Sequence, residues 1–159
     1  MLADSELGPP LALSCSARST ASDWFADVIA EHGIRRRDRV ALVGPNSPAW
    51  LAAYRALLGM GTVILLLDVD APRVERQRWL DQAGGGRMIA VDGSGDEVIV
   101  SGERVASEHP PTTVLLPTSG TTGAPKLVAR SVASLRAEGR RHQSWSGLTA
   151  EDEVVLALP

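Results

Sequence analysis

Residues 118–126 combine hydroxyl side chains, glycines and a lysine in one short segment between two apolar runs. Gly120 and Gly123 permit positive φ angles and leave backbone N–H groups unshielded. Successive exposed amides form a concavity that binds an anion, and nearby hydroxyl groups are donors that suit phosphate oxygens. Lys126 adds a charge-assisted contact to the same anion. The segment therefore predicts a polyphosphate-binding loop formed by Thr118, Ser119, Gly120, Thr121, Thr122, Gly123 and Lys126.

A hairpin turn with a solvated lysine is the plain alternative for this segment. The segment is not the P-loop of the common nucleotide hydrolases, in which a lysine directly follows the second glycine and a helix begins. Here Pro125 precedes Lys126, and the apolar residues after Lys126 predict a strand. Lys126 is also the only lysine among the 16 lysine and arginine residues. A compact ammonium group, which a planar guanidinium replaces poorly, is therefore favoured at this position.

The composition is that of an ordinary globular chain. Its 159 residues predict one domain, with 44% hydrophobic and 22% charged residues. The net charge of −3 gives no electrostatic reason to expect nucleic acid or an anionic membrane as a partner. Cys15 is the only cysteine, which excludes an internal disulfide and suits a reducing compartment. No apolar run reaches the roughly 20 residues of a membrane helix, and the N-terminus lacks the pattern of a secretory signal, so we expect a cytoplasmic location.

Strand-like and helix-like patterns alternate along the chain after a loose lead-in at residues 1–19. Ser47 and Pro48 are typical of a helix start, and Gly61 of a helix end. Helices are predicted at residues 22–32, 48–60, 72–83 and 131–146. Strands are predicted at residues 39–44, 62–68, 87–92, 97–102, 112–118, 126–130 and 153–159. This order predicts an α/β fold, a layered and mostly parallel sheet with helices on both faces.

Other candidate functional residues have structural interpretations. The three histidines show no metal-like spacing with each other or with Cys15 and are expected to be structural or solvent-facing: His32, His109 and His142. The tryptophans lie on predicted helices and are expected in the core: Trp24, Trp50, Trp79 and Trp145. The arginines at 35–37 and Arg39 predict a solvated turn. Asp68 and Asp70 could pair on a metal, but helix capping before Pro72 is favoured, so no metal site is predicted.

The string "PTSGTTGAPKLV" closely resembles the phosphate-loop signature of the acyl-adenylate-forming superfamily, which includes acyl-CoA synthetases, nonribosomal peptide adenylation domains and firefly luciferase. "GIRRRDRVALVGPNSPAWLAAYRALLGMGTVILLLD" and "GLTAEDEVVLALP" resemble segments before and after that signature. Leu127 stands where many members have glycine, and "LLLD" lacks the usual proline before Leu-Asp. The resemblance covers residues 20–159. It implies the first part of the family's large N-terminal domain, incomplete at its C-terminal side.

The resemblance implies an enzyme that activates a carboxylic acid with ATP and Mg²⁺. Acyl-AMP forms first, and a thiol of CoA or of carrier-protein pantetheine then displaces AMP. The residues of the loop would steady the charge on the leaving pyrophosphate. No catalytic residue is assigned, because most of the catalytic and Mg²⁺-binding motifs of the family have no counterpart here.

Those unmatched motifs leave two alternatives, a non-catalytic truncated fragment and one subunit of a split enzyme. We expect the 159 residues alone to be inactive in either case. Apolar surface on Val63–Leu67 and on residues 154–158 is expected to be uncovered. The chain is therefore expected to associate with a complementary chain or with a second copy of itself.

Overall fold

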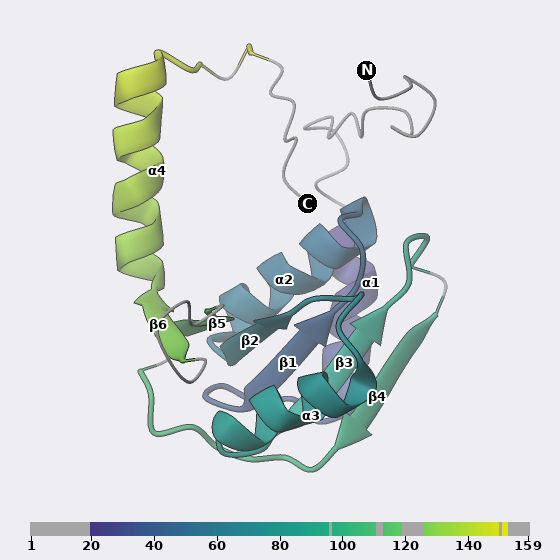
Figure 1. Ribbon diagram of the computed structural model, residues 1–159. Helices are drawn as coiled ribbons and strands as arrows, with labels where there is room; N and C mark the ends of the chain where they lie inside the picture. Colours follow the sequence, from purple (N-terminus) through teal and green to yellow (C-terminus); the bar gives the residue numbers. More distant parts are fainter. Residues whose placement is uncertain (1–19, 96, 111–112, 119–125, 150, 153–159) are drawn as a thin grey trace, which may run out of the picture.

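The part of the chain that the structure describes forms a six-stranded sheet with helices on both faces (Figure 1). This computed structural model describes residues 20–95, 97–110, 113–118, 126–149 and 151–152. The elements are α1 (Thr20–Glu31), β1 (Arg39–Val43), α2 (Pro48–Met60), β2 (Val63–Leu67), α3 (Arg73–Gln82), β3 (Arg87–Val91), β4 (Val98–Gly102), β5 (Thr113–Pro117), β6 (Leu127–Ser131) and α4 (Val132–Ser146). The predicted α/β class is confirmed. The predicted lead-in at 1–19 and strand at 153–159 lie outside the described residues.

The strand order is β4-β3-β1-β2-β5-β6. The central pairings, β3 with β1, β1 with β2 and β2 with β5, are parallel, whereas β4 and β6 pair antiparallel at the two edges. Parallel neighbours need crossover connections, and α2 and α3 provide them. The expectation that Val63–Leu67 is uncovered is wrong, because β2 lies between two strands and is buried.

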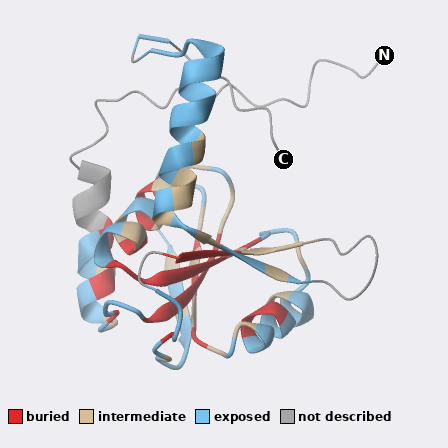
Figure 2. Ribbon diagram, turned by 90° about the vertical axis from the view of Figure 1, so that its left-hand side faces the viewer, coloured by how far each residue is buried: buried red, intermediate tan, exposed pale blue. Residues whose placement is uncertain are grey.

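The side chains of the central strands alternate between two cores, as the pleat of a strand requires. One set packs against α1 and α2: Val40, Leu42, Ile64 and Ile89. The other set packs against α3: Ala41, Val43, Val63 and Leu65. Figure 2 shows the buried residues concentrated in these strands and in the helix faces that touch them. Burial on both faces explains why β1 and β2 are continuous apolar runs.

The ends of the helices follow their local sequence only in part. α2 begins as predicted, because the Ser47 hydroxyl accepts a hydrogen bond from the Trp50 N–H at 3.1 Å. The prediction that Asp68 or Asp70 caps α3 is wrong. Pro72 occupies the cap position without a side-chain bond, and the Asp70 N–H donates to Oδ1 of Asp68 at 2.8 Å. The two aspartates thus form a turn after β2.

The helix α4 projects away from the sheet, with exposed residues along most of its length (Figures 1 and 2). None of its side chains is buried, and Trp145 is 85% exposed. The prediction of a core position is therefore wrong for Trp145, although it is right for Trp79, which is buried. Trp50 stacks on Tyr54 with ring centroids 5.5 Å apart, and the side chain of Trp24 lies outside the described residues.

Within the described ranges, no helix combines the length and the apolar character needed to cross a membrane.

Candidate functional site

The candidate loop connects β5 to β6, the antiparallel pair at one edge of the sheet. The register places Pro117 opposite Leu127, so Thr118 and Lys126 come next to one another at the base of the loop. β5 also pairs with β2 on its other side, which anchors the hairpin to the buried sheet. The remaining predicted loop residues lie outside the described residues: Ser119, Gly120, Thr121, Thr122 and Gly123.

Thr118 binds both backbone polar groups of Lys126. The Thr118 N–H donates to the Lys126 carbonyl at 2.9 Å, and the Thr118 hydroxyl donates to the same carbonyl at 3.0 Å. The Lys126 N–H in turn donates to Oγ1 of Thr118 at 3.3 Å. Lys126 is exposed, and no described residue forms an ion pair with it. Its ammonium group is therefore accessible to a ligand from solvent at the base of the loop.

The base of the loop lies at the carboxyl ends of the parallel strands. β2 and β5 are parallel neighbours with Leu65 opposite Leu115, so the residues after the two strands meet at the same edge. A hollow of about 300 Å³ at this edge is lined by Leu67, Asp68, Asp70, Ala71, Glu75, Trp79, Pro117 and Thr118. In open α/β sheets, ligands bind outside the carboxyl ends of the strands. The position of the loop is thus a favoured ligand-binding position in folds of this type.

This hollow is itself acidic. Asp68, Asp70 and Glu75 line it, and their like charges repel a polyphosphate. The described part of the chain contains no group of three or more His, Cys, Asp or Glu side chains arranged to hold a metal ion. The hollow is therefore a poor phosphate site, and the phosphate-binding prediction rests on the neighbouring loop.

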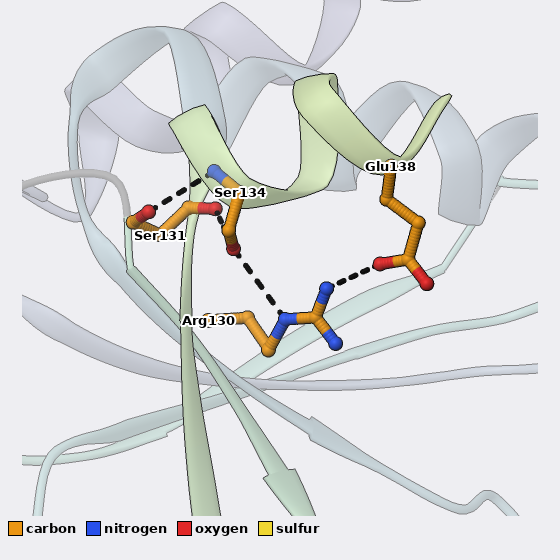
Figure 3. A network of polar contacts seen from close by, with 4 residues as sticks. All are labelled: Arg130, Ser131, Ser134 and Glu138. Carbon is orange, nitrogen blue, oxygen red and sulfur yellow. Dashed lines mark hydrogen bonds and ion pairs between the residues drawn. The ribbon is translucent and has the colours of Figure 1, made fainter. Parts of the chain in front are cut away.

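A polar network joins the far end of β6 to α4 (Figure 3). The Ser131 hydroxyl caps the helix by accepting from the Ser134 N–H at 3.1 Å, and the Ser134 hydroxyl donates to the Ser131 carbonyl at 2.8 Å. Nε of Arg130 donates to the Ser134 hydroxyl at 3.4 Å, and its guanidinium forms an ion pair with Glu138. These contacts fix the direction in which α4 leaves the strand that follows Lys126.

A second hollow, of about 690 Å³, lies between α2 and α4. Its lining combines apolar side chains with two arginines: Tyr54, Arg55, Leu58, Gly59, Val132, Leu135 and Arg136. Burial raises the pKa of the Tyr54 phenol above its ordinary value. Neither the position of this hollow nor its lining was predicted from the sequence, since it forms between helices far apart along the chain.

Arg39 is the residue that the sequence interpretation misplaced most clearly. Residues 35–37 are exposed, as predicted, but Arg39 is buried. Its Nη1 donates to the carbonyls of Gly84 and Gly85 at 2.7 and 3.2 Å, and its Nη2 donates to the Ser107 hydroxyl at 3.3 Å. Burial lowers the pKa of the Arg39 guanidinium, and the negative charge of Glu108 opposes that shift. Arg39 therefore joins two loops to the start of β1 rather than facing solvent.

The curated relatives are acid–CoA ligases much longer than this chain. The 2-succinylbenzoate–CoA ligase of Bacillus subtilis (strain 168) is 27% identical, over 87% of this chain and 32% of that protein. The mitochondrial acyl-coenzyme A synthetase ACSM2A of Homo sapiens is 25% identical, over 76% of this chain and 27% of that protein. The chain thus spans about a third or less of the length of these relatives.

Solved structures of adenylate-forming enzymes share the fold. The O-succinylbenzoate coenzyme A synthetase (MenE) from Bacillus subtilis, in complex with AMP, matches with a TM-score of 0.70 and 25% identity, over 87% of this chain and 41% of that chain. The same enzyme in complex with ATP and magnesium ion matches with a TM-score of 0.69 and 24% identity, over 87% and 42%. The model of the AMP-binding enzyme family matches residues 10–159. In sequence and in fold, then, this chain belongs to the AMP-binding enzyme family.

Proposed function

We propose that this chain carries the ATP phosphate-binding loop of an enzyme that activates a carboxylic acid. The observation that carries the proposal is the closed base of the hairpin, where Thr118 holds both backbone groups of the chain's only lysine. This base lies at the carboxyl edge of a parallel sheet, which favours ligand binding. The names of the relatives, acid–CoA ligases solved with AMP or with ATP and magnesium ion, support the same assignment.

In the proposed reaction, the substrate carboxylate attacks the α-phosphate of ATP, the bond to pyrophosphate breaks and an acyl-adenylate forms. A thiol of CoA or of carrier-protein pantetheine then attacks the acyl carbon, and AMP leaves. Negative charge builds on the departing pyrophosphate, so preorganised donors and a cation lower the barrier. Lys126 would supply that cation. The other donors would be the hydroxyls of Ser119, Thr121 and Thr122 and the backbone amides at Gly120 and Gly123.

Magnesium would accompany the phosphates of ATP, where it offsets their charge. The described residues include no set of carboxylates that fits the ion, since Asp68, Asp70 and Glu75 do not form a metal-holding group. We propose, as the resemblance implies, that most protein ligands of Mg²⁺ belong to the part of the relatives that this chain does not span. No step of the proposed reaction depends on a described residue acting on the metal.

Lys126→Ala should weaken the binding of ATP and of inorganic tripolyphosphate about tenfold or more. A hydrogen bond to a charged group is worth roughly 1.5–3 kcal/mol, and 1.4 kcal/mol is about tenfold in affinity. Calorimetric titration with each ligand measures the change, at low ionic strength because salt screens an exposed contact. Arg35→Ala is the matched control, since it removes an exposed cation far from the loop along the chain. Equal affinities for the wild type and the Lys126 variant would mean that the segment is a hairpin turn with a solvated lysine and not a phosphate-binding loop.

The second candidate function is a role in which this chain needs a complementary polypeptide, and the exposure of α4 favours it. No side chain of α4 is buried, Trp145 is 85% exposed, and the hollow between α2 and α4 mixes apolar and basic lining. The chain spans only 27% and 32% of two relatives. We propose that a polypeptide equivalent to their unmatched part covers this face, either in the same chain or as the partner in a split enzyme. The 159 residues alone would then not complete the reaction.

The isolated 159 residues should therefore associate through the α4 face and catalyse no acid-dependent exchange of radiolabelled pyrophosphate into ATP. Light scattering over a range of concentrations measures the association, which Trp145→Glu should weaken because it removes the large exposed ring. Val74→Glu provides the matched control, because it makes the same kind of change at a hydrophobic residue that is 78% exposed on α3, outside the α4 face. A monomer at every concentration, binding no hydrophobic dye, would exclude this interaction surface. Robust pyrophosphate exchange by the isolated residues would show that they need no complement.

A further inference from the structure

The pairing of Thr118 with Lys126 departs from a regular antiparallel pair. Opposite residues of antiparallel strands alternate between pairs that exchange both backbone N–H···O bonds and pairs that exchange none. The Thr118 N–H does donate to the Lys126 carbonyl, at 2.9 Å. The Lys126 N–H, however, donates to the Thr118 hydroxyl at 3.3 Å instead of to the Thr118 carbonyl. The side chain of Thr118 thus takes the place of its own carbonyl in the last pair before the loop.

The single hydroxyl proton of Thr118 is engaged by this arrangement. A threonine hydroxyl has one O–H to donate and lone pairs to accept. The O–H donates to the Lys126 carbonyl at 3.0 Å, and the oxygen accepts from the Lys126 N–H. A phosphate ligand needs a donor, and Thr118 has no hydroxyl proton left for one. We propose that Thr118 is a positioning residue, which fixes the backbone of Lys126 for its contact with phosphate, and not itself a phosphate ligand.

The two strands that Thr118 joins differ in how firmly they are held. β5 is buried between β2 and β6, with Val114 and Leu115 only 1% and 2% exposed. β6 is an edge strand whose residues are exposed or half-buried. Without the bonds from Thr118, Lys126 would fray together with the edge strand that follows it. Each binding event would then have to order Lys126, and the entropy lost in doing so would weaken the affinity for phosphate. Thr118 hydrogen-bonds the backbone of Lys126 to the end of the buried strand, so Lys126 is already ordered before a ligand binds. This role rests on the proposed phosphate-binding function.

The test compares Thr118→Val, which keeps the shape and removes the hydroxyl, with Thr118→Ser, which keeps the hydroxyl. Thr118→Val should speed hydrogen exchange of the Lys126 amide and lower the affinity for tripolyphosphate about threefold to tenfold. Thr118→Ser should retain wild-type exchange and affinity. Thermal unfolding checks each variant, and Thr118→Ala replaces Thr118→Val if the latter fails to fold.

A double-mutant cycle with Lys126→Ala separates positioning from direct binding. If Thr118 acts through Lys126, Thr118→Val should change the affinity less than twofold once Lys126 is alanine. An equal loss in both backgrounds would make Thr118 a phosphate ligand and overturn the inference. Loss of affinity in Lys126→Ala but not in Thr118→Val would overturn the positioning role alone. If Lys126→Ala binds tripolyphosphate with wild-type affinity, the proposed phosphate-binding function is wrong, and the positioning role is wrong with it.

Discussion

Gly86→Ala should lower the free energy of unfolding by about 3 kcal/mol or more. Gly86 has a φ of 137°, a conformation that L side chains rarely adopt. A Cβ at this position would lie 2.6 Å from the carbonyl oxygen of Arg39, which is backbone and cannot rotate away. The same Cβ would also lie 3.2 Å from the carbonyl carbon and from the Cβ of Arg39. Strain and overlap therefore act together at the start of β3.

Unfolding in urea, followed by circular dichroism, measures this loss. Gly59→Ala is the matched control, because a Cβ there meets nothing within 4 Å and the residue lies within α2. The same glycine-to-alanine change should stabilise the protein at Gly59 by about 0.5–1 kcal/mol, since alanine is the better helix former. Wild-type stability of Gly86→Ala would mean that the turn before β3 rearranges at little cost.

Arg39→Ala should destabilise the fold by about 2–3 kcal/mol. The guanidinium holds the carbonyls of Gly84 and Gly85 and the hydroxyl of Ser107, so its removal leaves three acceptors without this donor. The loss is partly offset, because the buried Nε of Arg39 has no hydrogen-bond partner among the described residues and burial of the charge is itself unfavourable.

Two variants test this role of Arg39. Arg39→Lys keeps the charge but replaces the planar fork, so it should recover only part of the stability. Arg35→Ala removes an exposed arginine from the turn before β1 and should change the stability by no more than about 0.5 kcal/mol. If Arg39→Ala unfolds at the same urea concentration as Arg35→Ala, the three acceptors are satisfied by water and Arg39 does not hold the loops in place.

The positions of the helices and strands were predictable because their signals are local. The predicted helix at 48–60 is α2, with Ser47 as its cap and Gly61 at its end. The predicted strand at 62–68 contains β2. It was predictable because a short, continuous apolar run bounded by turn residues is typical of a buried strand. Each of these predictions depends on residues within a few positions of one another.

The errors concern residues whose environment depends on distant parts of the chain. Arg39 and residues 35–37 look alike in sequence, but Arg39 is buried and its guanidinium donates to the carbonyls of Gly84 and Gly85, which lie far away along the chain. Trp145 is apolar and helical, but no other described element covers its end of α4. The error at Asp68 and Asp70 is instead local, because the turn after β2 directs Oδ1 of Asp68 to the Asp70 N–H, two residues away, and not to the start of α3. The surroundings of Arg39 and of Trp145 could not be read from the residues next to them in the sequence.

The sequence by itself determined which groups the loop contains, hydroxyls, glycines and the single lysine of the chain, and the prediction of phosphate binding rests on those groups. Only the tertiary structure decided what surrounds that loop. The strand order places β5 beside β2, so Thr118 lies beside an acidic hollow at the edge where Asp68 follows β2. The register of β5 and β6 brings Thr118 onto Lys126, eight residues away. Strand order and register follow from burying both faces of the central strands, a constraint on the whole chain that no short segment contains.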